Sequence, residues 1–305
     1  MAARLLLKAR PTSRQLADRL RPVDGHWPDG VELYLAAADL TDVDALVQRL
    51  QETHVPDDFV WLIEGPVDSL DGADFDVTRE SGADRLVLQR LGEVARRIGA
   101  QAVNIHVIAP GADLSRLTLE CRSALLERAV PFLAEFVSIM QAAGAVPTVE
   151  HMPPVLRMRR GDFSFTPIGM ASDDFVFLTR RVAGLRTLVD TSHAGLYLNA
   201  RRLPPDTAYA WSVPLRSYLD QLPSDSADLV AFMASLPELE NAQVSNAAGV
   251  LGEGLGYGDG DFDLDPPIRW LSQHVRHVVT ETLEANNDEA VNMREALRRM
   301  RQAVR

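Results

Sequence analysis

Short apolar runs alternate with amphipathic stretches along this whole chain, and this alternation limits the possible folds more than any other feature. Most of the runs contain Val, Ile, Leu and Ala with few polar interruptions, as expected for strands that are covered on both faces. The pattern predicts a parallel sheet with crossover helices. Eight runs are found, at residues 4–8, 31–35, 59–64, 102–108, 145–150, 185–190, 242–246 and 277–283.

The segments between the runs have helical periodicity. Between residues 80 and 99, apolar residues recur at steps of four, three and four, and Gly99 can end that helix. A similar stripe runs from Leu126 to Met140, before Gly144. We expect N-caps at Thr41 for the second helix and at Asn287-Asp288 for the eighth.

Eight strand–helix units without a long polar linker favour one closed barrel over two separate lobes. The predicted fold class is α/β, a single (β/α)8 TIM barrel domain over residues 1–305. Three connections are unusually long, at residues 152–184, 196–240 and 247–265, and the second contains a predicted helix at 225–236. Each follows the carboxyl end of a strand, where barrel enzymes place their substrate-binding loops.

Charge and cysteine content exclude several classes of partner. The formal net charge is -12, which makes nucleic acid and anionic membranes poor partners. Cys121 is the single cysteine and cannot form an internal disulfide, which favours a reducing cytoplasm. No stretch approaches the length of a membrane span. We expect a cytoplasmic protein that acts on a small carbohydrate-like molecule, and the sequence leaves open whether it forms a homo-oligomer.

Polar residues stand where four of the predicted strands end: Glu150, Asp190, Gln243 and Glu281. A buried carboxylate needs a compensating positive charge, and three that converge in one barrel mouth favour a bound divalent cation. A single acid at a strand end is more often a helix cap or a salt-bridge partner, and Asp190 could cap the sixth helix. The repetition at strand–helix spacing favours the metal site.

Four strings carry a family resemblance: Val149-Glu150-His151, the segment 189–194 around Asp190 and His193, the Gly-rich segment 254–263, and Val279-Thr280-Glu281. With these strings the chain resembles the sugar phosphate isomerase/epimerase family of the xylose isomerase-like TIM barrels, in the superfamily that also holds the apurinic endonucleases. The resemblance implies metal ligation by Glu150, Asp190 and Glu281. It also implies a fourth ligand on strand seven, usually histidine, where this chain has Gln243.

Two departures from the family pattern have consequences. An amide oxygen at Gln243 would make the site oxygen-rich and favour Mn²⁺ or Mg²⁺ over zinc, or it would weaken metal binding or abolish it. The endonuclease branch needs further His and Asp ligands after strand seven, but Gly252-Glu253-Gly254 stands there. A multinuclear zinc site and DNA repair are therefore not expected.

Further side chains are candidates for contact with substrate. His193 resembles the family residue that orients substrate, although it could be a surface residue of the first helical turn. His106 could bind a substrate hydroxyl or be a satisfied barrel histidine. Arg157, with Arg159 and Arg160, could bind a phosphate or carboxylate or form a solvated basic turn. Lys8, Glu32 and Glu64 could equally close a polar network or line the pocket, and we expect them to line it at most. We expect the Gly-rich run to be a flexible active-site loop.

The leading functional hypothesis is metal-dependent isomerisation or epimerisation of a small polyhydroxy carbonyl compound through an enediolate. Glu150 and Glu281 would move the proton, and Asp190 would hold the ion. His193 and His106 would fix the substrate hydroxyls. The alternatives are a dehydratase or lyase on a keto-cyclitol or similar substrate, and a noncatalytic sugar- or partner-binding barrel with a degraded metal site.

Overall fold

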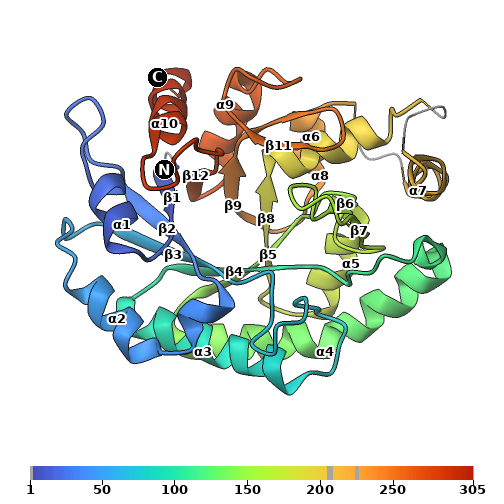
Figure 1. Cartoon of the computed structure of the whole chain (residues 1–305), viewed down its shortest axis with the longest axis horizontal. Coiled ribbons are helices and arrows are strands. Elements are labelled where there is room, and N and C mark those ends of the chain that lie inside the picture. Colours follow the sequence, from blue (N-terminus) through green and yellow to red (C-terminus); the bar gives the residue numbers. More distant parts are fainter. Residues whose placement is uncertain (1–2, 205–208, 224–226, 305) are drawn as a thin grey trace.

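Eight parallel strands close into a barrel in the computed structural model, which describes residues 3–204, 209–223 and 227–304. This confirms the predicted (β/α)8 TIM barrel. Figure 1 shows the barrel with its strands at the centre. Around the barrel, neighbour to neighbour, the strands are β1 (Arg4–Ala9), β12 (His277–Thr280), β9 (Leu239–Val244), β8 (Arg186–Asp190), β5 (Val146–Glu150), β4 (Ala102–His106), β3 (Val60–Glu64) and β2 (Gly30–Tyr34).

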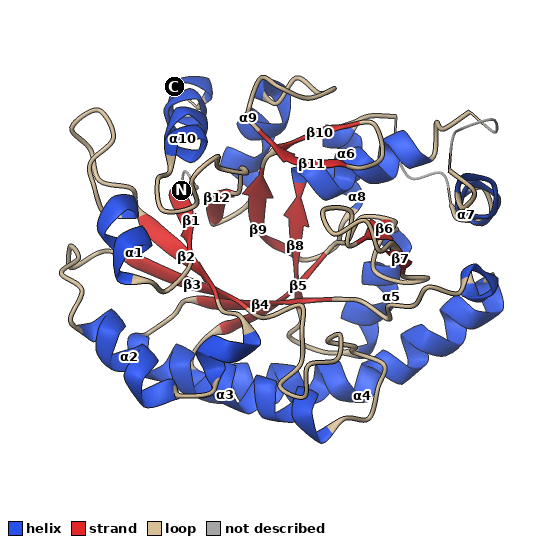
Figure 2. Ribbon diagram, in the orientation of Figure 1, coloured by secondary structure: helices blue, strands red, loops and turns tan. Residues whose placement is uncertain are grey.

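Helices surround this barrel on its outside, as Figure 2 shows. The C-terminal helix α10 contacts β1, so the two ends of the described chain meet at one point of the barrel wall. The helices are α1 (Ser13–Arg19), α2 (Val43–Gln51), α3 (Gly82–Ile98), α4 (Leu119–Ala143), α5 (Ser172–Arg181), α6 (Thr191–Ala200), α7 (Ser212–Leu219), α8 (Leu229–Ser235), α9 (Asp265–His274) and α10 (Val291–Ala303), with short 3₁₀ turns η1 (Ala37–Leu40) and η2 (Leu114–Arg116). None of the described helices is both long and apolar enough to cross a membrane.

The long connections carry secondary structure of their own. The connection after β5 forms the hairpin β6 (Val155–Leu156) and β7 (Ser164–Phe165) and then α5. The one after β9 forms a second hairpin, β10 (Asn246–Ala248) and β11 (Gly252–Leu255), where we expected only a loop. The helix expected at 225–236 is α8, and residues 224–226 lie outside the described part of the chain.

Some predicted boundaries were wrong by a few residues. Strand β9 begins and ends earlier than expected, and β12 ends at Thr280, so Glu281 is the first residue after it. Asp42, not Thr41, caps α2, because its Oδ1 accepts the backbone N–H of Ala45 at 3.0 Å. The N-cap position of α10 is Ala290, which has no side-chain oxygen, so the expected cap at Asn287-Asp288 was wrong.

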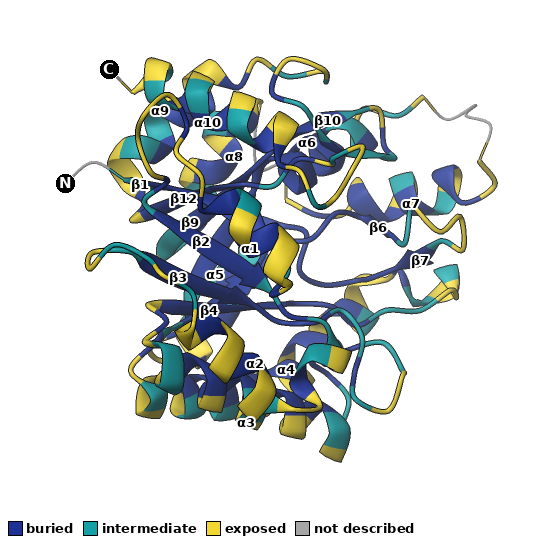
Figure 3. Ribbon diagram, turned by 60° about the vertical axis from the view of Figure 1, so that its left-hand side comes forward, coloured by how far each residue is buried: buried dark blue, intermediate teal, exposed yellow. Residues whose placement is uncertain are grey.

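The barrel interior is divided into an apolar layer and a polar layer. Leu6, Val60, Leu62, Ala102 and Val279 pack together inside the barrel, apart from the main core under the helices. Side chains two residues further along a strand point to the same face. Lys8, Glu64, Asn104 and Glu281 stand two residues after Leu6, Leu62, Ala102 and Val279. Because each polar residue follows its apolar residue along the chain, the polar layer lies toward the carboxyl ends of the strands. Figure 3 shows that β1, β3, β4 and β12 are buried.

Candidate active site

A cavity of about 690 Å³ opens at the carboxyl ends of the barrel strands. Polar residues make its floor: Lys8, Glu64, His106, Glu150, His193 and Glu281. One wall is apolar, and within it Ile108, Met152 and Leu156 form a small buried cluster separate from the main core. The cavity therefore offers a charged floor and a nonpolar side to one ligand, as sites for small molecules commonly do.

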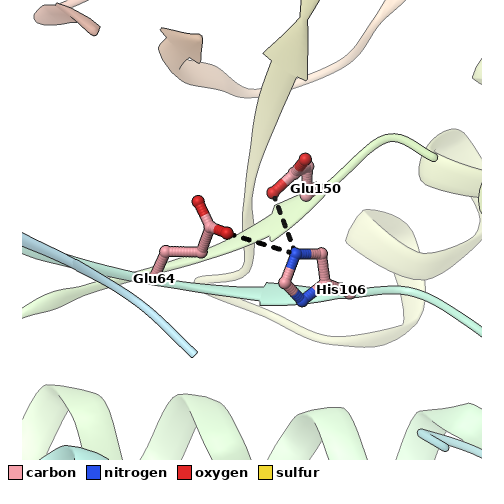
Figure 4. Close-up of side chains that lie close together, drawn as sticks. All are labelled: Glu64, His106 and Glu150. Atoms are coloured by element: carbon pink, nitrogen blue, oxygen red, sulfur yellow. Dashed lines mark ion pairs between the residues drawn. The ribbon is translucent and has the colours of Figure 1, made fainter. Parts of the chain in front are cut away.

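Glu150, the last residue of β5, lies at the centre of the polar floor. Its Oε2 accepts a hydrogen bond from Asn104 Nδ2 at 2.5 Å and lies 3.6 Å from His106 Nε2. The same imidazole nitrogen is 3.5 Å from Glu64 Oε1, so the ring lies between two carboxylates, as Figure 4 shows. Burial opposes a charge on His106, but Glu150 and Glu64 outweigh it and raise the pKa of the ring.

Asp190, the last residue of β8, caps helix α6 with one of its oxygens. Its Oδ1 accepts the backbone N–H groups of Ser192 and His193 at 2.5 and 3.1 Å. Burial raises the pKa of this carboxyl to about 6, and nearby Glu150 adds to the effect. Ligand atoms of Glu150, Asp190 and His193 lie within 4.8 Å of one another. The capping role therefore coexists with a place in a possible metal cluster.

His193 is buried and has an acceptor at each ring nitrogen. Its Nδ1 lies 2.9 Å from the carbonyl oxygen of His151 and 3.2 Å from Glu150 Oε1. Its Nε2 lies 2.9 Å from Glu253 Oε1. Burial disfavours a charged ring, but the surrounding carboxylates outweigh it and raise the pKa of His193 well above its usual value. A ring that donates from both nitrogens has no lone pair left for a metal, so in this arrangement His193 balances the charge of the acids around it.

Glu253 is a site residue that the sequence analysis missed. It lies on β11 and reaches His193, and its Oε2 is 3.2 Å from Arg159 Nη2. Burial opposes its ionisation, yet the hydrogen bond from His193 outweighs burial and lowers the pKa of Glu253 to about 2. The available signal was an acid between two glycines in the connection after strand seven.

Three glutamates from separate strands surround the ammonium group of Lys8. We call Glu32, Glu64 and Glu281 the three-glutamate cluster, since their ligand atoms lie within 4.8 Å of one another. Lys8 Nζ lies 2.6 Å from Glu281 Oε1 and 3.5 Å from Glu32 Oε2, and it also forms an ion pair with Glu64. Lys8 thus does more than line the pocket, and the charged residue that ends the first apolar run was the sequence signal for it.

Gln243 contacts the same glutamates. Its Nε2 donates to Glu32 Oε2 at 2.7 Å and to Glu64 Oε2 at 2.5 Å. These two bonds fix which end of the amide faces the glutamates. The carbonyl oxygen Oε1 is left buried with no hydrogen-bond partner among the described residues.

One carboxylate oxygen of Glu281 forms an ion pair, and the other has no hydrogen-bond partner among the described residues. Oε1 pairs with Lys8, while Oε2 is buried without a partner in the described part of the chain. Burial raises the pKa of Glu281 well above its usual value, and Glu64, Asp190 and Glu150 add to this while Lys8 opposes it. These acids are therefore close enough to influence the pKa of Glu281, although they belong to different clusters.

The donor set fits a hard divalent cation. Glu150 and Asp190 share one candidate cluster, Gln243 is the register partner of Asp190, and Glu281 belongs to the three-glutamate cluster instead. Gln243 and Glu281 each have a buried oxygen that no described protein donor satisfies. Buried polar atoms without partners are rare and commonly mark an ion or water, and oxygen ligands suit Mg²⁺ or Mn²⁺.

Arg157 lines the cavity but is already paired. It forms an ion pair with Asp74 and lies 3.0 Å from Asp162 Oδ2. Arg159 and Arg160 also line the cavity and are more than half exposed, at 55% and 57% of their side-chain surface. The basic turn therefore reaches the cavity mouth, and its two exposed members are paired as well, Arg159 with Glu253 at 3.2 Å and Arg160 with Asp68 at 3.7 Å.

Solved structures of other proteins share this architecture over their whole length. A D-tagatose 3-epimerase-like protein superposes with a TM-score of 0.65 at 15% identity, over 99% of this chain and 98% of that one. The chain has a xylose isomerase-like (β/α)8 barrel fold. A 3-keto-D-glucoside 4-epimerase from E. coli gives 0.62 at 12% identity, over 98% and 99%. A protein from Thermus thermophilus, soaked with ZnCl2, gives 0.63 at 18%, over 99% of both chains.

Sequence comparison adds no closer relative. No protein-family model matches this chain, and no curated protein matches it. The structural neighbours of this xylose isomerase-like barrel therefore show the fold, and several of them are sugar epimerases by name.

Proposed function

We propose that this protein is a divalent metal-dependent isomerase or epimerase of a small polyhydroxy carbonyl compound. The observation that carries the proposal is a pair of buried oxygens without a partner among the described residues, Gln243 Oε1 and Glu281 Oε2. They accompany the candidate cluster of Glu150, Asp190 and His193, whose two acids lie close enough to Glu281 to raise its pKa. The sugar epimerases among the structural neighbours support a carbohydrate substrate. Mn²⁺ or Mg²⁺ is the ion that we expect.

Glu150 and Glu281 are suited to move a proton between two faces of a substrate. When bound, a divalent cation would polarise the carbonyl group of the substrate and stabilise negative charge on its oxygen. Going around the barrel, two strands separate β5 from β12 on one side and four on the other. The two carboxylates thus approach the barrel centre from different sides. One would remove a proton beside the carbonyl group, and the other would return it.

The histidines and the apolar wall would hold the substrate. Both rings are buried among carboxylates that favour their protonated forms and raise the pKa of each ring. His106 Nδ1 has no partner among the described residues and can donate to a hydroxyl group, whereas His193 would first have to release His151 or Glu253. Glu253 would orient His193 from its second nitrogen. The wall of Ile108, Met152 and Leu156 would pack against the nonpolar face of a sugar ring or a substituent on it.

A noncatalytic binding protein is the second candidate, and one observation favours it. Lys8, His106 and His193 already lie among the acids of the site, so the protein itself balances part of their negative charge. Metal analysis separates the candidates. The enzyme should bind close to one Mn²⁺ per chain after loading and dialysis, whereas a binding protein with a degraded site would retain far less.

The test of catalysis is solvent deuterium incorporation. The Mn²⁺-loaded protein would be incubated with a panel of ketoses and keto-cyclitols in D2O, and label would be sought at the carbon beside the carbonyl group. Glu281→Gln should keep the fold and lower the rate of incorporation by at least about a hundredfold, the usual contribution of a general acid or base.

A matched control is available at the other end of the barrel. Glu240 lies near the start of β9 and pairs with Arg276 at 3.0 Å, away from the cavity. Glu240→Gln should therefore leave incorporation unchanged. Equal rates in the wild type and in Glu281→Gln would remove Glu281 from the mechanism, and no label from any member of the panel would argue against isomerase chemistry.

A further inference from the structure

In the described part of the chain, three groups of side chains in and beneath the polar floor could each hold a cation. Glu64 with His106 and Glu150 is one, and Glu150 with Asp190 and His193 is another. Both of these contain an imidazole ring. The third is the three-glutamate cluster, which consists of carboxylates alone. By ligand chemistry, the third group is therefore the one most similar to a site for a hard divalent ion.

The three-glutamate cluster already encloses a positive charge. Lys8 Nζ forms an ion pair with each of its three members, and the lysine side chain is only 8% exposed. An ammonium group and a metal ion would take the same position for the same reason, since each compensates carboxylates that are out of water. Both cannot be there at once, because like charges a few ångströms apart repel strongly in a buried site.

The amide of Gln243 closes the cluster from the neighbouring strand. Its Nε2 donates to Glu32 Oε2 and Glu64 Oε2, the same two oxygens that face Lys8. An N–H group and an ammonium group on those oxygens leave little lone-pair capacity for a metal. Among the described residues, the free acceptors Gln243 Oε1 and Glu281 Oε2 are therefore the oxygens that remain for an exchangeable ion.

We propose that Lys8 is a built-in cation of the three-glutamate cluster, which takes the place of a second metal ion and confines the exchangeable ion to the side of Glu150, Asp190 and Gln243. The reaction centre then holds one exchangeable divalent ion and one fixed ammonium group. Two-metal sites clamp two substrate oxygens between their ions. Here the fixed charge of Lys8 lies at the cavity floor, where a second oxygen of the substrate would develop negative charge.

The inference rests on the proposed function only for the first ion, and metal stoichiometry tests it without a substrate. Wild type and Lys8→Ala would be loaded with Mn²⁺, dialysed, and analysed for bound manganese per chain. Lys8→Ala should bind one Mn²⁺ more than the wild type. Without metal, Lys8→Ala should have a lower melting temperature than the wild type, because three carboxylates have lost their counter-charge. Added Mn²⁺ should raise the melting temperature of Lys8→Ala by more than it raises that of the wild type.

A double variant shows whether the extra ion lies in the cluster. Glu32→Gln in the Lys8→Ala background removes one of the three carboxylates and should weaken the extra site at least tenfold. Should Lys8→Ala fold poorly without metal, Lys8→Gln is measured instead, since its amide still donates to the carboxylates but carries no charge. Folding that returns only with Mn²⁺ supports the proposal.

The outcomes separate this inference from the proposed function. One ion in the wild type and two in the variant supports both. No ion in the wild type and one in the variant supports the role of Lys8 and argues against the proposed metal enzyme. The same number of ions in both proteins, or an extra ion that Glu32→Gln does not weaken, overturns the role of Lys8.

Discussion

Replacing Gln243 by histidine tests how the strand-seven position selects the metal. In the structure the amide donates two hydrogen bonds, to Glu32 and Glu64, and leaves its oxygen without a partner among the described residues. A histidine ring can reproduce one of these bonds from one nitrogen and direct the other nitrogen to the ion. A carboxylate that accepts the second N–H of a metal-bound imidazole orients the ring and raises its basicity, and such pairs contribute about 10- to 100-fold in metal affinity.

The gain should depend on the metal. Imidazole suits Zn²⁺, whereas an amide oxygen suits Mn²⁺ or Mg²⁺. We therefore expect Gln243→His to tighten Zn²⁺ binding about 10- to 100-fold and to change Mn²⁺ binding much less. Both affinities can be measured by competition with a fluorescent chelator. Gln221→His serves as the control, because Gln221 is exposed, its amide donates to the carbonyl oxygen of Ser217, and it does not line the cavity. Unchanged Zn²⁺ affinity in Gln243→His would mean that this side chain is not a ligand.

Two further predictions concern stability. Burial, with Arg4 and Arg276 nearby, lowers the pKa of His277 from 6.5 to about 4, so the neutral ring is favoured in the folded state. The contribution of the neutral ring to the free energy of unfolding is present above pH 6.5 and is lost as the pH falls toward 4. Between pH 7.5 and pH 5, the wild type should therefore lose about 2 kcal/mol more stability than His277→Gln, as measured by urea unfolding. Parallel pH curves for the two proteins would contradict the shift. Gly169 has a φ of +83°, and an added Cβ would lie 2.0 Å from the carbonyl oxygen of Val107. Gly169→Ala should therefore lower the free energy of unfolding by about 3 kcal/mol or more. Gly161 has a φ of +75° and open space around it, so Gly161→Ala should lower it by about 1 kcal/mol. Equal losses of melting temperature in the two variants would refute the steric explanation.

The strand ends were predictable because burial leaves a clear sequence signal. Glu150 and Asp190 each stop an apolar run, and the structure has each as the last residue of a barrel strand. The rule that the parallel strands of a barrel end at one rim then brings their side chains together without further information.

The partners of these side chains could not be predicted in the same way. Lys8 meets Glu281 across almost the whole length of the chain, because β1 pairs with β12 when the barrel closes. Glu253 reaches His193 from a hairpin whose glycines look like a loop in the sequence. Closure and hairpin pairing are long-range events, and a one-dimensional pattern of apolar residues does not record them.

The position of Glu150 affects how variants at this site must be interpreted. Its two oxygens face Asn104, His106 and His193 at once. A substitution there would release three neighbours together, so an inactive Glu150 variant could not distinguish a lost base from a collapsed scaffold. Glu281 is more informative, since its Oε2 has no hydrogen-bond partner among the described residues and its Oε1 pairs with Lys8, so a substitution there disturbs fewer neighbours. Assignment of the proton-transfer steps should therefore begin from the end of β12 rather than from the most connected acid in the barrel.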